Sequence, residues 1–166
     1  MKKVLKNQKG LTLVELLAVI VILGIIAAIA VPAIANIIDN SRKDAHVANA
    51  ESMYDAARLA VVGENLSSGD DWTFYATQED DGTFAADENT SLADNRVNLV
   101  EENYLDGQPE NPSGDSYGTL VVYYDGDDYY VNVGGLFSDD SFDTWTDDAD
   151  AYKITDIRSL GRDIVE

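Results

Sequence analysis

Apolar residues are concentrated near the N-terminus, where residues 16–35 form a run of twenty without a charged side chain. A helix of this length spans roughly 30 Å, the thickness of the hydrocarbon layer of a bilayer. Beyond this run, polar residues alternate with apolar ones at spacings of three and four: Val47, Ala50, Tyr54, Ala57 and Val61. The pattern predicts one long helix from about Thr12 to Val62, hydrophobic over residues 11–35 and amphipathic over residues 36–62.

Residues 63–166 predict a separate head with short elements. Gly63 opens a stretch rich in Gly, Ser and Asp, which ends the long helix. A short strand is expected at residues 72–76, and the apolar spacing over residues 92–105 predicts a short helix.

The strongest local signal in the head is a β-hairpin. Residues 119–124 and 129–133 are rich in β-branched and aromatic side chains, and the Asp125-Gly126 pair lies between them. A weak alternation over residues 151–157 predicts a third strand. The fold class is therefore α+β, with a long N-terminal helix packed on a small antiparallel sheet.

Charge is distributed as unevenly as hydrophobicity. The net charge of −20 comes from 11 basic and 31 acidic residues, and four of the basic residues are lysines within residues 1–10. The acids are concentrated in the head, which argues against direct nucleic-acid binding because that binding depends on Lys and Arg. The chain has no cysteine, which excludes disulfides, thiolate zinc sites and a thiol nucleophile.

The basic start and the apolar run predict a membrane segment with a cytoplasmic N-terminus and an extracytoplasmic head. A cleaved signal peptide and a plain single-span anchor are two interpretations of this segment. Neither accounts for Glu15, an acid inside the apolar segment, because an acid at membrane depth costs about 2.5–3.5 kcal/mol on insertion scales.

The sequence around Glu15 suggests a third interpretation. Lys9-Gly10-Leu11-Thr12-Leu13-Val14-Glu15 is a basic leader that ends in glycine, followed by a hydrophobic residue, Thr, two aliphatic residues and Glu. This pattern resembles the N-terminus of the type IV pilin superfamily, which comprises pilins and pseudopilins. The resemblance implies a leader over residues 1–10, cleavage between Gly10 and Leu11 by prepilin peptidase, and N-methylation of Leu11. Mature pilins most often begin with Phe, so Leu11 departs from the commonest pattern.

The resemblance also implies how subunits associate. The new α-amine of Leu11 would neutralise the Glu15 carboxylate of a neighbouring subunit in the apolar core of a helical filament. Gly24 and Pro32 are poor residues for a helix interior, and in filaments of this family the helix is often melted between such positions. We therefore expect residues 24–32 to be helical in the monomer and partly extended in the filament.

The remaining candidate residues predict little chemistry. His46, the only histidine, is expected to be a partly exposed helix residue without a ligand role. The acidic groups at 125–128 and 139–150 are interpreted as solvated surface, with a calcium site in residues 135–150 as the alternative. No catalytic, cofactor or metal residues are assigned, and the chain is not expected to be an enzyme.

These observations predict a structural subunit of a type IV pilus-like filament. It would be a single-pass membrane precursor, in contact with lipid before assembly, and later part of a cell-surface filament. The partners implied are further copies of itself, the peptidase/N-methyltransferase, an assembly platform and an ATPase. The alternatives are a pseudopilin of a secretion or DNA-uptake apparatus and a secreted or membrane-anchored acidic binding domain. Motility, adhesion, DNA uptake and secretion all remain compatible roles.

Overall fold

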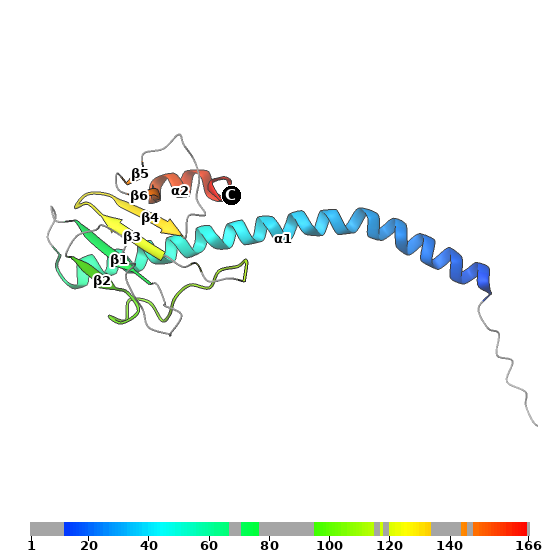
Figure 1. The fold of residues 1–166 in the computed structure, drawn as a ribbon, viewed down its shortest axis with the longest axis horizontal. Coiled ribbons are helices and arrows are strands. Elements are labelled where there is room, and N and C mark those ends of the chain that lie inside the picture. Colours follow the sequence, from blue (N-terminus) through cyan, green and yellow to red (C-terminus); the bar gives the residue numbers. More distant parts are fainter. Residues whose placement is uncertain are drawn as a thin grey trace, which may run out of the picture. The chain divides into compact units, whose positions relative to one another are not determined.

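The structure is a computed structural model that describes residues 12–66, 71–76, 95–114, 117, 120–133, 144–145 and 148–165. The chain divides into two compact units between Asp39 and Asn40. The first unit contains the N-terminal part of helix α1 (Leu13–Gly63). The second contains the rest of α1 and every strand (Figure 1).

Helix α1 runs unbroken from Leu13 to Gly63 through Pro32, which confirms the long helix predicted from the sequence. Its C-terminus is closed by Asn65, which adopts a positive φ of 54°. The Leu66 N–H reaches back to the Val61 carbonyl at 3.1 Å. This arrangement is a Schellman-type cap, in which a residue in the left-handed region reverses the chain and satisfies a terminal helix carbonyl.

The head contains one six-stranded sheet in the order β2-β1-β3-β4-β6-β5. Its strands are β1 (Trp72–Tyr75), β2 (Arg96–Asn98), β3 (Leu120–Tyr124), β4 (Tyr129–Val133), β5 (Thr144–Trp145) and β6 (Asp148–Lys153). All neighbouring pairs are antiparallel except β1 and β2, which run parallel. The predicted β3–β4 hairpin and the strand at β1 are confirmed.

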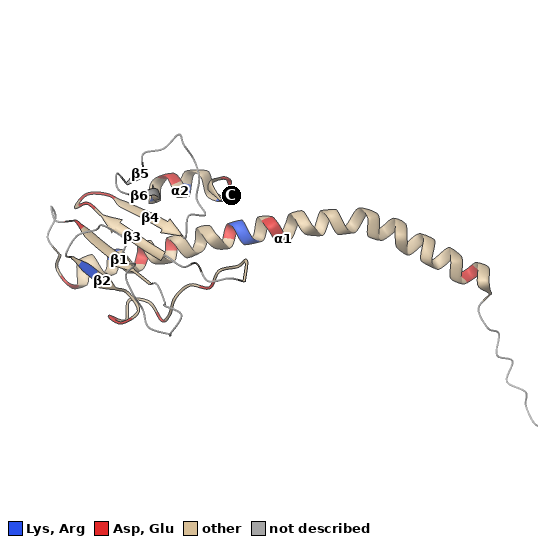
Figure 2. Cartoon of the chain, in the orientation of Figure 1, with Lys and Arg blue, Asp and Glu red and all other residues tan. Residues whose placement is uncertain are grey.

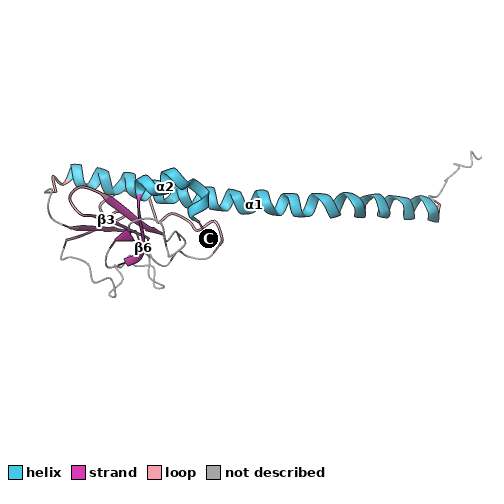
Figure 3. Cartoon of the chain, turned by 90° about the horizontal axis from the view of Figure 1, so that it is seen from above, coloured by secondary structure: helices cyan, strands magenta, loops and turns pink. Residues whose placement is uncertain are grey.

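The core lies between α1 and one face of the sheet, and in Figure 3 both helices lie on the same side of the strands. Alternation along β3 explains this packing, since Leu120, Val122 and Tyr124 point toward α1 while Val121 and Tyr123 contribute to a cluster on the other face. On α1 the buried residues recur every three or four positions: Ala50, Met53, Ala57 and Ala60. The apolar helix face predicted from the sequence therefore packs against the sheet.

The helix predicted at residues 92–105 is wrong over its described part, residues 95–105. Residues 96–98 form β2, and turns follow it. The Asn98 side chain accepts hydrogen bonds from the N–H groups of Val100 and Glu101, while the Tyr104 and Leu105 N–H groups both bond to the Leu99 carbonyl. Asparagine competes with helical hydrogen bonding in this way, and the apolar spacing is satisfied by a compact turn instead.

The strand predicted at residues 151–157 is only partly correct. Strand β6 ends at Lys153, and helix α2 (Ile154–Leu160) starts at the next residue, followed by a 3₁₀ turn at Gly161–Ile164. Ile154 and Ile157 are three residues apart and both buried, which is the spacing of a helix face rather than of a strand.

Candidate functional site

The candidate site begins where α1 begins, at Thr12 and Glu15. The Thr12 N–H and hydroxyl donate to Glu15 Oε2 at 2.7 and 2.8 Å, and the Glu15 N–H lies 3.3 Å from Thr12 Oγ1. This reciprocal arrangement is a capping box, which satisfies backbone N–H groups that the first helical turn leaves free. Glu15 therefore has a partner inside its own chain, a role that the Thr-x-x-Glu spacing encodes but that the sequence analysis did not assign.

The other predicted site residues are not gathered around Glu15. Gly24 and Pro32 lie within α1, about 13 and 25 Å further along the helix at 1.5 Å per residue. A Cβ added at Gly24 would meet no atom within 4 Å, so the subunit itself has no steric need for glycine there. Gly10 and Leu11 lie outside the described residues.

The first unit exposes almost its entire apolar surface. Exposed large apolar side chains occur throughout α1 from Leu13, which is 80% exposed, to Ile38, which is 48% exposed. By length and composition, α1 has a segment apolar enough to cross a membrane, and none of that segment is buried by the rest of the chain. Such a surface requires a lipid or protein partner, because isolated soluble chains rarely expose apolar patches of this extent.

Comparison with known families assigns this segment. Residues 5–31 match the prokaryotic N-terminal methylation motif. The chain carries a type IV pilin-like leader. The match covers Gly10, Leu11 and Glu15 and extends into the exposed apolar part of α1. Comparisons with curated proteins and with solved structures gave no match.

The motif supports a precursor of the type IV pilin or pseudopilin type. It implies processing by a prepilin peptidase and assembly into a filament, and it fits a membrane-anchored precursor. The family that carries this motif is structural rather than catalytic. The leader motif thus continues directly into the exposed apolar helix.

His46 differs from its prediction, because it is buried rather than partly exposed. Its Nδ1 lies 2.7 Å from the Tyr117 hydroxyl, which also accepts a hydrogen bond from Asn49 Nδ2 at 2.7 Å. The same Asn49 amide donates to the Glu110 carbonyl. Burial lowers the pKa of His46 and raises that of Tyr117. The histidine therefore helps to hold Tyr117 on α1, a role that depends on a partner 71 positions away.

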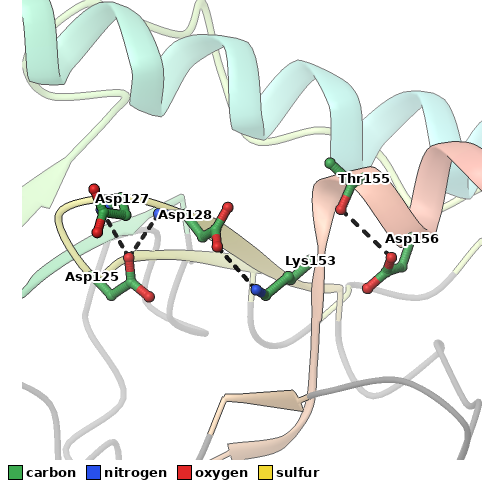
Figure 4. A network of polar contacts seen from close by, with 6 residues as sticks. All are labelled: Asp125, Asp127, Asp128, Lys153, Thr155 and Asp156. Carbon is green, nitrogen blue, oxygen red and sulfur yellow. Dashed lines mark hydrogen bonds and ion pairs between the residues drawn. The ribbon is translucent and has the colours of Figure 1, made fainter.

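The acidic hairpin turn is organised by its own hydrogen bonds (Figure 4). Asp125 Oδ1 accepts from the N–H groups of Asp127 and Asp128 at 2.9 and 2.7 Å, and Gly126 has a φ of 95°. Asp128 forms an ion pair with Lys153 at 2.9 Å, which raises the Lys153 pKa. Among the described residues no group of three or more potential ligands could hold a metal ion. The residues of the proposed calcium site, 135–150, have no described side chains.

Helix α2 and the 3₁₀ turn that follows it contact α1 through three basic side chains. Arg158 pairs with Glu51 at 3.2 Å and lies 4.8 Å from the centre of the Tyr54 ring. Arg162 pairs with Asp44 at 3.0 Å, and Lys43 Nζ donates to the Val165 carbonyl at 2.6 Å. These contacts were not predicted from the sequence, in which their only signal is that Asp44 and Glu51 lie two helical turns apart on α1.

Proposed function

We propose that this protein is a structural subunit of a type IV pilus-like filament. In this proposal prepilin peptidase cleaves between Gly10 and Leu11, Leu11 is N-methylated, and the apolar part of α1 becomes the filament core. The supporting observation is that the methylation motif runs directly into a helix whose apolar side chains are exposed in the isolated chain. A filament core would keep those side chains out of water, and exposing them to water would cost about 25 cal/mol per Å².

The proposed role of Glu15 follows from its position. Before cleavage its carboxylate caps α1 through Thr12. After cleavage, the α-amine of Leu11 in a neighbouring subunit supplies a cation for the same carboxylate in an apolar environment. Pairing would neutralise two charges that are each costly when buried alone, and it would set the axial register of the subunits.

Mass spectrometry and N-terminal sequencing of the protein from its natural cells test this proposal. The expected result is a chain that begins with N-methylated Leu11 and is recovered in sheared surface filaments. An intact Met1 would support a plain anchor, and a start near Val31 or Asn36 would support a secreted binding domain. Correct processing with only short, membrane-associated assemblies would support a pseudopilin.

A further inference from the structure

Basic side chains are scarce in the processed chain that the proposed function requires. Four of the 11 basic residues precede Leu11, so seven face 31 acids after cleavage. Figure 2 shows how few positions of the described chain carry Lys or Arg. Copies of so acidic a subunit repel one another, and each cation that is free to contact a neighbour reduces that repulsion.

All seven basic residues lie in the described part of the chain, and five of them have partners within it. Lys43, Lys153, Arg158 and Arg162 make the contacts given above, and Arg96 is also engaged. Arg42 and Arg58 form no ion pair or hydrogen bond with any described residue. Arg58 lies near the partly buried Tyr129 of the same chain, whose phenol pKa is raised by burial and lowered in part by the Arg58 charge. Arg42, by contrast, is exposed on α1 close to the start of the second unit at Asn40. Arg42 is therefore the cation most available to another molecule.

The second unit, residues 40–166, also has an open groove beside α1. It has a volume of about 440 Å³ and is lined by Ser52, Asp55 and Leu59 of α1 and by Tyr104 and Leu105 of the following turn. Leu59 is 61% exposed, and together with Val62 it accounts for the exposed large apolar side chains of the second unit's described residues. The groove thus combines apolar walls with acidic groups.

Asp55 is the acid of this groove without a partner. The other carboxylate lining it, Glu51, pairs with Arg158, whereas Asp55 forms no ion pair or hydrogen bond with a described residue. An unpaired carboxylate beside exposed Leu59 suits an arginine, whose aliphatic stem packs on apolar groups while its guanidinium binds a carboxylate.

We propose that the groove at Asp55 and Leu59 is a contact between subunits, occupied by Arg42 of a second copy of this chain. Asp55 and Arg42 are 13 positions apart on one helix, about 20 Å at 1.5 Å per residue. The contact therefore joins two copies staggered along parallel helices and cannot form within one chain. This inference rests on the proposed function, and it adds an electrostatic contact between heads to the apolar contact between N-terminal helices.

Charge exchange in full-length protein, expressed in the natural cells, tests the contact. Arg42→Glu and Asp55→Arg should each lower the yield of sheared filaments by about tenfold or more, because each places like charges opposite one another. The double variant should recover most of the yield. Arg58→Glu is the matched control, since it reverses the other unpaired cation, and it should leave the yield within about twofold of wild type.

Two results would overturn the contact: normal filaments from both single variants, or a double variant no better than either single one. If Arg58→Glu lowered the filament yield as much as Arg42→Glu, the loss would come from the change in net charge and would count against the contact. Mass spectrometry should find the N-terminus of every variant processed at Leu11. If wild-type protein itself formed no filaments, the proposed function would fail, whereas failure of charge rescue alone would remove only this contact.

Discussion

At the scale of single residues, the observed role of Glu15 as a helix cap can be separated from its proposed role in the filament. In the monomer its carboxylate is an acceptor for Thr12, which a neutral amide oxygen could also be. In the proposed filament its negative charge is needed, which an amide lacks. Substitutions of Glu15 and of its capping partner Thr12 therefore distinguish capping from charge pairing.

We expect Glu15→Gln to keep the helix cap and leader cleavage but to lower filament yield by about tenfold or more, because the neighbouring amine loses its counter-charge. Thr12→Ala is the matched control. It should weaken the cap by about 0.5–2 kcal/mol while leaving filaments largely intact. Yields of sheared filaments and circular dichroism in detergent measure the two effects. Wild-type filament yield from Glu15→Gln would contradict the charge role.

We expect His46 to make the stability of the head depend on pH. The pKa of His46 is lowered from its ordinary value of 6.5 by burial, so the unfolded chain binds the proton more readily than the folded one. The contribution of neutral His46 is complete above about pH 6.5 and is lost as the pH falls toward the lowered pKa.

We therefore expect wild-type protein to lose more stability than His46→Gln when the pH is lowered from 7.5 to 5. Thermal unfolding of both proteins across this range measures the difference, and the variant corrects for the many carboxylates that titrate in both. If the stability of the two proteins fell equally with pH, His46 would not contribute to the pH dependence. Hydrogen exchange should locate the early loss at residues 110–114, whose attachment to α1 includes Asn49.

At the scale of elements, local patterns predicted part of what neighbouring residues determine, but not the turn at Asn98 or helix α2. The long helix, the end of that helix at Gly63 and the β3–β4 hairpin follow from apolar spacing and from the Asp-Gly turn. Strand β2 could not be predicted in this way, because its three residues are held by parallel pairing with β1. The burial of His46 likewise depends on Tyr117, a partner distant in sequence.

Gly24 is a position at which the helix geometry of α1 can be tested against the proposed assembly. Because a methyl group there would meet no atom of the subunit, Gly24→Ala should stabilise the monomeric helix by about 1 kcal/mol. We expect the same change to reduce filament yield, since it opposes both local extension and close approach of neighbouring helices. Circular dichroism in detergent tests the stability of the monomeric helix, and electron microscopy of sheared filaments tests the filament yield. A filament map with unbroken helix through Ala28 would contradict the extension.

At the scale of the whole molecule, the sequence predicted the contrast between an apolar N-terminal segment and an acidic head. The methylation motif and the exposed side chains of residues 13–38 support that division. The distribution of cations could not be predicted, because which of them are engaged depends on contacts such as Arg158 with Glu51. The candidate groove at Asp55 was also missed, since Tyr104 and Leu105 reach it through a turn that the sequence pattern assigned to a helix.

The excess of acids should make the proposed assembly sensitive to ionic strength. We expect the yield of filaments reassembled from purified, processed subunits to rise between 10 and 150 mM salt, as the screening length falls from about 30 to 8 Å. Pelleting at constant pH measures this yield. A yield that falls steadily over this range would indicate that attraction between opposite charges outweighs repulsion between the acidic heads.

The anchoring of Val165 has a practical consequence for labelling. Ile164 and Val165 are buried, and the Val165 carbonyl is held by Lys43 of α1. Any tag joined close after Val165 would therefore begin beside an immobilised carbonyl at the surface of α1. A linker of about ten residues, which spans up to roughly 33 Å when extended, should give an affinity label or fluorophore free access.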